Sequence, residues 1–153
     1  MPHPILVCTY TNVAVDNLVE GMARAGLMPL RVGFQGNIRS SLLPHSLDFK
    51  LQSHHLYPTL EGVKSDADAL AKDLRRKQTA YSKALLKIKE SQTPNKNKMT
   101  RVANMLKDIT TMKLRHKGIE KKIYAMRQEM LRDVVSDADV VSVVLGTLFP
   151  LTN

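Results

Sequence analysis

The sequence predicts an α/β fold in which a long helical hairpin is inserted between two strands of a small parallel sheet. Three observations carry this prediction: a β-branched run that passes into an amphipathic helix near the N-terminus, two long heptad stripes in the middle, and a second β-branched run near the C-terminus. Buried parallel strands are continuous apolar runs, whereas packed helices repeat about every 3.5 residues. The expected segments are residues 1–59, 60–134 and 135–153, and most of the chain is expected to be helical.

Residues 1–59 are expected to contain a strand, a helix, a second strand and an irregular loop. The run Ile5–Thr9 has the length and composition of a strand buried on both faces, so Cys8 within it is expected to be a small buried residue. An amphipathic helix over residues 13–25 and a short strand over residues 29–33 complete a β-α-β crossover. Residues 34–58 contain turn-forming residues and three histidines, and we expect them to be irregular.

Residues 60–134 carry the longest periodic pattern. Steps of three and four residues define one apolar stripe from Leu60 to Ile88 and another from Met99 to Met130, with turn-forming residues and a proline between them. Heptad stripes of this length are typical of helices that lie along one another, so we expect an antiparallel coiled-coil hairpin. After it, residues 139–145 are β-branched enough for a third buried strand, which an atypical tail follows.

The positive charge is confined to the hairpin. The formal net charge is +9, yet residues 72–132 contain 18 Lys or Arg against five Asp or Glu, an excess of 13 positive charges. This pattern indicates either phosphate binding along a nucleic-acid strand or the solvated outer face of a coiled coil, and the residues leave both open. The cations that we assign to nucleic-acid binding are Lys72, Arg75, Arg76, Lys121 and Lys122.

Composition excludes several classes of protein. A chain of 153 residues with 43% hydrophobic residues can form a core, and its single cysteine excludes a disulfide framework and a cysteine-based zinc site. No apolar stretch approaches the roughly 18 residues of a membrane span. We therefore expect an intracellular protein, cytoplasmic or nuclear, without a membrane partner. His45, His54 and His55 have no cysteine or carboxylate at a metal-ligand spacing, so they are expected to be surface residues and no metal site is expected.

The junction between the first strand and the helix is the strongest candidate site. Tyr10, Thr11 and Asn12 follow the strand directly, where the carboxyl edge of a parallel sheet meets a helix N-terminus. Hydroxyl, amide and unpaired backbone N–H groups at such a point can bind a phosphate. The same geometry allows Thr11 and Asn12 simply to cap the helix, and both interpretations stay open. Asp16 is expected to be structural, because a carboxylate in the first turn favours the helix dipole.

At this junction the sequence resembles a known family. The run from Ile5 to Leu18, ILVCTYTNVAVDNL, is similar to motif Ia of superfamily 1 helicases of the Upf/Sen type, the group that includes the nonsense-mediated-decay helicase. Residues 26–33 resemble the next strand of that family, and the hairpin occupies the position of its helical stalk. Residues 137–141, DADVV, match its Ala-Asp-Val return strand. The resemblance covers about residues 5–141.

The resemblance implies a fold and a set of partners. It implies a partial RecA-like parallel sheet, taken from the first RecA-like domain between motif Ia and the stalk. In that family the positions of Tyr10, Thr11 and Asn12 face single-stranded RNA or DNA. Thr11 and Asn12 would therefore hydrogen-bond phosphates, and Tyr10 would lie against a base or sugar. The rest of a helicase core would be a further partner.

The resemblance also implies what the chain lacks. Intact members use ATP and Mg²⁺, with a Gly-rich loop ending in Gly-Lys-Ser/Thr before motif Ia and an Asp-Glu strand after the stalk. None of the seven glycines here has that spacing. We therefore expect a helicase fragment without catalytic residues, without a cofactor of its own and without ATPase activity alone. Its last dozen residues replace the family's Cys-Thr-Thr-Cys, and we expect an aberrant tail from truncation or a mis-spliced gene.

A second hypothesis comes from a different class. The chain would be a stand-alone basic coiled-coil module that binds nucleic acid or a partner helix without catalysis. Both hypotheses expect no ATP turnover, so an ATPase assay does not separate them. A Gly-Lys-Thr loop encoded just upstream would identify the helicase fragment.

Overall fold

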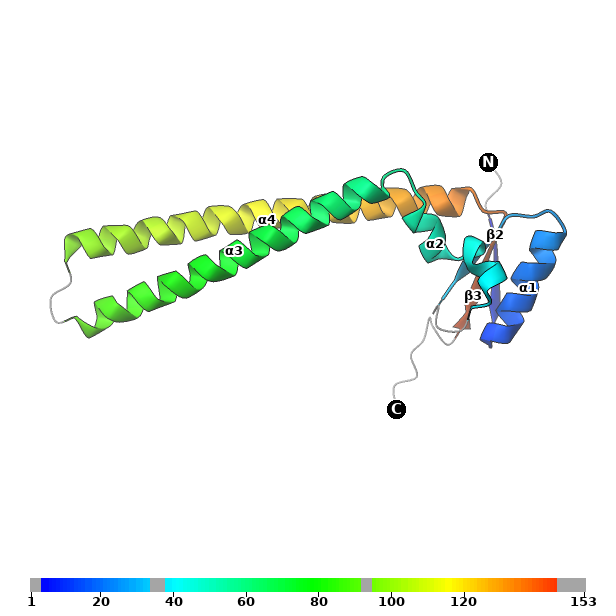
Figure 1. Cartoon of the computed structure of the whole chain (residues 1–153), viewed down its shortest axis with the longest axis horizontal. Coiled ribbons are helices and arrows are strands. Elements are labelled where there is room, and N and C mark those ends of the chain that lie inside the picture. The colour runs from blue at the N-terminus through cyan, green and yellow to red at the C-terminus, as the bar shows by residue number, and fades with distance from the viewer. Residues whose placement is uncertain (1–3, 34–37, 92–94, 146–153) are drawn as a thin grey trace. The chain divides into compact units, whose positions relative to one another are not determined.

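The computed structural model describes residues 4–33, 38–91 and 95–145 (Figure 1). Residues 146–153 of the predicted atypical tail and the proline of the hairpin loop lie outside these ranges, whereas the first four residues of that tail, 142–145, are described. Two compact units form: Met1–Tyr57 with Arg127–Asn153, and Pro58–Met126. Along the chain, the elements are β1 (Ile5–Thr9), α1 (Asn12–Arg24), β2 (Pro29–Val32), a 3₁₀ helix (Ser40–His45), α2 (Leu47–Gln52), α3 (Tyr57–Glu90), α4 (Lys96–Ser136) and β3 (Val140–Val144).

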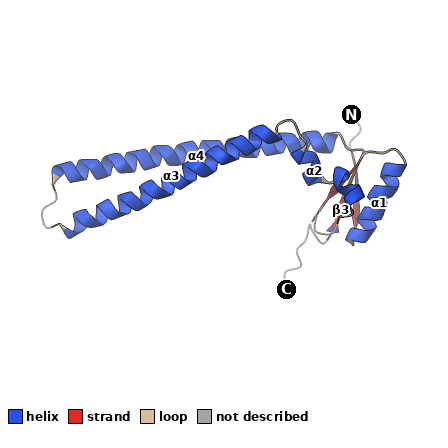
Figure 2. Cartoon of the chain, in the orientation of Figure 1, coloured by secondary structure: helices blue, strands red, loops and turns tan. Residues whose placement is uncertain are grey.

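The predicted α/β class, mostly helical and with an inserted antiparallel hairpin, is confirmed (Figure 2). All strands of the sheet are parallel, in the order β1-β3-β2, so the strand that follows the hairpin lies in the centre. Asp139, just before β3, joins the starts of the three strands. Its carboxylate accepts a hydrogen bond from Met28 N at 2.8 Å, its N–H donates to Met28 O at 3.0 Å, and its carbonyl accepts from Ile5 N at 2.9 Å.

A small apolar core lies on each face of the sheet. On one face, Val15 and Val19 of α1 pack with Leu42 and with Val144 of β3. On the other, Leu30 of β2 packs with residues near the end of α4 and with two leucines of α2. Because neighbouring strand residues point to opposite faces, Arg31 lies on the α1 side while the residues before and after it lie on the other.

The prediction that β1 is buried on both faces was wrong. Ile5 and Leu6 are 65% and 64% exposed, and Cys8, expected to be buried, is exposed as well. Successive residues of a strand face opposite sides, so both faces of β1 are largely open. Within the described residues, β1 pairs only with β3. Apolar composition identifies a strand, but it does not say whether other elements of the chain cover it.

The segment expected to be irregular, residues 34–58, is largely helical where the structure describes it. Ser46 ends the 3₁₀ helix and begins α2, since its Oγ donates to Leu43 O at 2.8 Å and accepts from Phe49 N at 3.3 Å. Ser46 also forms an isolated bridge with Arg31. These short helices supply Leu42 and other apolar residues to the two cores, so the long connection covers the sheet.

Not every predicted surface histidine is on the surface. His55 is exposed and His45 is half-buried, but the His54 side chain is only 9% exposed. Its Nε2 lies 3.3 Å from Asp133 Oδ2 on α4, and its Nδ1 accepts from Leu56 N at 3.2 Å. The carboxylate comes from a residue 79 positions away in the chain, so no local spacing could have indicated it.

The two long helices run antiparallel (Figure 1). Lys77 Nζ on α3 lies 3.8 Å from Asp108 Oδ2 on α4. Residues of the predicted stripes are mostly the less exposed ones, with Ala67 and Ile109 buried. Two predicted stripe residues, Met99 and Leu106, are instead 55% and 47% exposed. None of the described helices is both long and apolar enough to cross a membrane.

Candidate nucleic-acid interface

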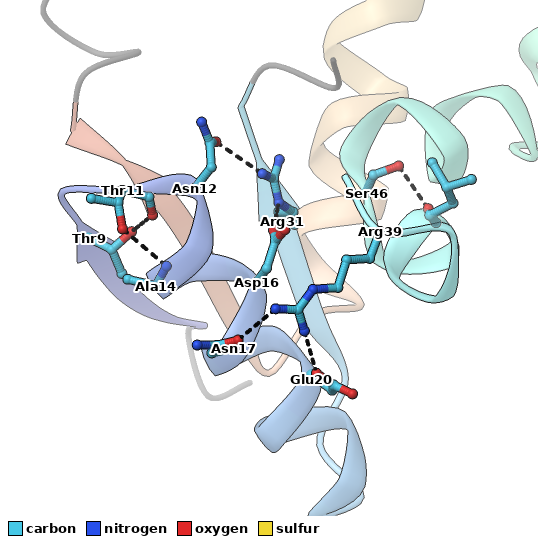
Figure 3. Close-up of polar contacts among 11 residues, drawn as sticks. Thr9, Thr11, Asn12, Ala14, Asp16, Asn17, Glu20, Arg31, Arg39 and Ser46 are labelled. Carbon is cyan, nitrogen blue, oxygen red and sulfur yellow. Dashed lines mark hydrogen bonds and ion pairs between the residues drawn. The ribbon is translucent and has the colours of Figure 1, made fainter. Parts of the chain in front are cut away.

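The turn between β1 and α1 is fixed by its own hydroxyl groups (Figure 3). Thr11 has an extended backbone and is the N-cap of α1, because its Oγ1 accepts from Ala14 N at 3.1 Å. Its carbonyl accepts from Val15 N at 3.2 Å and also from Thr9 Oγ1 at 3.1 Å. Thr11 therefore does cap the helix. Capping uses it as an acceptor, and the hydroxyl proton remains available for a further acceptor.

Asn12 is held differently. It is the first residue of α1, and its Oδ1 accepts from Arg31 Nη2 at 3.1 Å. In Figure 3, the amide nitrogen of Asn12 points away from Arg31. The N–H groups of Asn12 and Val13 belong to the first turn, whose donors have no acceptor within the helix. At the entry to α1, the chain thus presents an amide group and helix N-terminal N–H groups together.

A buried ion pair between Arg31 and Asp16 holds the Asn12 side chain in place. Arg31 Nε lies 2.7 Å from Asp16 Oδ1, and the two side chains are 1% and 6% exposed. Asp16 was predicted to be structural, and the structure gives a different reason from the helix dipole: it neutralises a cation inside the fold. Removing one partner of such a pair leaves an uncompensated buried charge, which is strongly destabilising. The guanidinium of Arg31 thereby links α1, β2 and the amide of Asn12.

A second arginine attaches the loop to α1. Arg39 Nη1 lies 2.9 Å from Glu20 Oε2, and its Nη2 donates to Asn17 Oδ1 at 3.1 Å (Figure 3). These groups are more exposed than the Arg31 pair. Asn17 resembles Asn12 in that its side-chain amide is on α1 and accepts a hydrogen bond from an arginine. A substitution at Asn17 is therefore a matched control for the same substitution at Asn12.

The predicted site residues differ in their surroundings. Tyr10 is 86% exposed, Thr11 is exposed, and Asn12 is half-buried. The structure brings these three together at one turn. The predicted cations of the hairpin are all exposed: Lys72, Arg75 and Arg76 on α3, and Lys121 and Lys122 on α4.

The hairpin cations do not form one cluster. The Lys77–Asp108 ion pair shows which residues of the two antiparallel helices face each other, and Lys72 accordingly lies roughly opposite residue 113. Lys121 lies opposite residue 64, roughly two helical turns further along the hairpin. The positive surface of this unit is therefore extended along the helices.

A separate cleft, of about 610 Å³, lies beside His54 and Asp133. Both ring nitrogens of His54 are engaged, one by Leu56 N–H and the other by Asp133. The imidazole thus has no free nitrogen to act as a base. Within the described ranges, no group of three or more His, Cys, Asp or Glu side chains could hold a metal ion.

Two residues that organise this unit, one at the site and one at the opposite end of the sheet, were not identified from the sequence. Arg31 had a usable signal, since a charged residue in the middle of a short apolar strand must find a partner when that strand is buried. Asp139 belongs to the matched Ala-Asp-Val run, but its hydrogen bonds with Met28 and Ile5 join segments more than 100 residues apart. No local pattern predicts those hydrogen bonds.

Comparison with known proteins identifies relatives of the chain. Residues 1–148 match the AAA domain family. Over 64 residues, the chain is 34% identical to the DNA polymerase alpha-associated DNA helicase A of Schizosaccharomyces pombe. This alignment covers 42% of the chain but 10% of the helicase, so the chain corresponds to a small part of that relative.

Proposed function

Because the chain belongs to the AAA domain family of Upf/Sen-type superfamily 1 helicases, we propose that it contributes single-stranded nucleic-acid contacts to a helicase core. The observation that carries the proposal is the fixed junction after β1, where Thr11 caps α1 and Asn12 is held by the buried Arg31. A phosphate there would meet the Asn12 amide group, the Thr11 hydroxyl and the positive end of the helix. Tyr10, exposed beside it, would contact a base or sugar.

The hairpin would add affinity without sequence preference. Its exposed cations Lys72, Arg75, Arg76, Lys121 and Lys122 lie in a segment with an excess of 13 positive charges. Phosphate binding of this kind releases counterions from the nucleic acid, so affinity falls as salt rises.

The open surface of β1 supports a further part of the proposal. Ile5 and Leu6 are exposed on opposite faces of a strand with the composition of a buried one. We propose that other parts of a helicase core cover β1. This would bury the exposed part of two large apolar side chains, each contributing about 1 to 2 kcal/mol, because roughly a third of each is buried already.

The first prediction tests the junction. Full-length chain should bind a fluorescent single-stranded oligonucleotide, RNA or DNA, at low salt and lose affinity at high salt. Asn12→Asp keeps the acceptor for Arg31 but places a negative charge at the phosphate position, and it should weaken binding about five- to tenfold. Asn17→Asp makes the same change elsewhere on α1 and should have little effect. An equal loss of oligonucleotide affinity in Asn12→Asp and Asn17→Asp would contradict the proposal. So would the absence of oligonucleotide binding by the unmodified chain at low salt.

The second prediction concerns ATP. We propose that this chain alone does not hydrolyse ATP, since its 153 residues contain no Gly-rich loop with a terminal Gly-Lys-Ser/Thr. Without such a loop and a Mg²⁺-binding carboxylate, the phosphates are not positioned for transfer. Phosphate release measured with Mg²⁺, ATP and single-stranded nucleic acid should stay at the level of a protein-free blank. ATP hydrolysis that stays proportional to the amount of this protein through successive purification steps would refute the prediction.

A further inference from the structure

The end of the hairpin carries an apolar groove that the nucleic-acid proposal does not use. This groove lies between α3 and α4 and has a volume of about 420 Å³. Its floor consists of Ala80, Ala84, Ile88, Val102 and Met105. None of the cations assigned above to nucleic-acid binding lines it.

The groove exists because a small residue, Ala84, occupies the seam of the hairpin, and another, the exposed Ala80, lies beside it. Alanine is too short to fill the space between two helices, whereas the leucines typical of a coiled-coil seam would reach across it. Among the described residues from 68 to 108, none in the hairpin is fully buried. Leu86, Met99 and Leu106 nearby are 57%, 55% and 47% exposed. Apolar side chains are therefore exposed at this end of the hairpin, beside the groove.

The rim of the groove is strongly basic. It is lined by Lys83, Lys87, Lys98 and Arg101. None of these four cations forms an ion pair with another residue in the part of the chain that the structure describes. Residues 80–105 contain six Lys or Arg and a single acidic residue, Glu90. The groove thus combines an apolar floor with a rim of one charge sign.

We propose that this groove binds an acidic amphipathic helix of a partner protein. Such a helix would place apolar side chains, spaced at i, i+3, i+4 and i+7, over Ala84 and Val102. Its flanking Asp and Glu side chains would pair with Lys83, Lys87 and Arg101. A third helix added to a helix pair in this way completes the packing that the alanines leave open.

Two other occupants fit less well. Single-stranded nucleic acid gains much of its affinity from bases stacked on aromatic side chains, and the groove lining contains none. A second copy of this hairpin would bring two surfaces of the same positive charge together. Charge complementarity therefore favours an acidic protein segment.

The experiment uses the full-length chain and a synthetic fluorescent peptide of about four helical turns. The peptide carries Leu and Ile along one face and Glu and Asp along its flanks, and a scrambled peptide of the same composition is the control. Fluorescence anisotropy should show the scrambled peptide binding at least about tenfold more weakly.

Two variants locate the binding. Ala84→Leu fills the groove without changing charge and should weaken peptide binding about tenfold or more, whereas Ala103→Leu, at an exposed alanine of α4, should not. The double charge reversal Lys87→Glu with Arg101→Glu should also weaken binding of the acidic peptide. Circular dichroism checks that the variants remain helical.

The outcomes separate this proposal from the preceding one. Oligonucleotide binding should be unchanged in Ala84→Leu, because the groove is not part of the junction. Equal binding of both peptides, or equal affinity of Ala84→Leu and Ala103→Leu, would overturn the helix-docking proposal alone. Loss of oligonucleotide binding in Ala84→Leu would overturn it too, by assigning the groove to nucleic acid.

Discussion

At the scale of single residues, Arg31 determines how the candidate interface is built. Its guanidinium is almost fully buried, pairs with Asp16 and donates to the Asn12 side chain. A buried charge needs a partner of opposite charge and further hydrogen bonds, so this residue constrains both α1 and β2. The amide that we propose to meet a phosphate is thus positioned by a residue 19 positions away.

The third prediction follows from that pair. Asp16→Ala leaves the Arg31 guanidinium buried without its counter-charge, and should lower the opening free energy of α1 by about 3 kcal/mol. Native-state amide exchange of α1 peptides measures this locally, which suits a chain of two units. Glu20→Ala removes the exposed pairs with Arg24 and Arg39 and should cost below about 1 kcal/mol. Similar losses for the two variants would show that burial of the Arg31 pair has no energetic consequence.

At the scale of elements, position in the sheet matters more than composition. β1 and β3 are both β-branched, yet β3 is the buried central strand and β1 is exposed on both faces. β3 hydrogen-bonds with a strand on each side, and both apolar cores include residues of it. β1, which carries the junction, therefore has fewer strand partners and fewer packing contacts than β3 within the described residues.

The fourth prediction compares two leucines of the same sheet. Leu30 of β2 is 0% exposed, whereas Leu6 of β1 is 64% exposed. Leu30→Ala creates a cavity and should lower the free energy of unfolding of this unit by about 2 to 5 kcal/mol. Leu6→Ala should cost well below about 1 kcal/mol, since its side chain is mostly in water already. Amide exchange of β3 measures the loss of unfolding free energy in each variant. An equal loss in Leu30→Ala and Leu6→Ala would mean that β1 is covered in solution.

At the scale of the whole molecule, charge is distributed unevenly along the sequence. The net charge of +9 combines a hairpin segment with an excess of 13 positive charges and a remainder with five basic and nine acidic residues. Such a distribution attracts polyanions to the helices, and salt screens that attraction. The nucleic-acid binding that we propose should therefore be sequence-independent and sensitive to salt.

The fifth prediction is a change in that salt dependence. The triple variant Lys72→Ala, Arg75→Ala and Arg76→Ala should reduce the slope of log affinity against log salt by about 0.7 for each phosphate that the protein no longer neutralises. Alanine substitution of Arg24, Arg39 and Lys50, which lie outside the hairpin, removes the same charge and is the control. Unchanged slope in the first variant, or the same reduction in both, would argue against binding by these cations.

Local pattern predicted most of the elements. The runs around Ile5–Thr9 and Val140–Val144, the helix after the junction and both hairpin helices agree with the structure, because side-chain period and β-branching act over neighbouring residues. The short helices within residues 38–52 were missed, since six-residue helices are too short to show a period. His54 was placed on the surface because its partner Asp133 is distant in the chain.

The sequence by itself determined the α/β class, the inserted hairpin, the family and the Tyr10-Thr11-Asn12 junction, because these depend on local composition and on a contiguous motif. Only the tertiary structure decided that β3 lies between β1 and β2, that β1 is open on both faces, and that Arg31 holds Asn12. These features depend on which distant segments meet, and that is set by strand pairing and by the need to neutralise a buried charge.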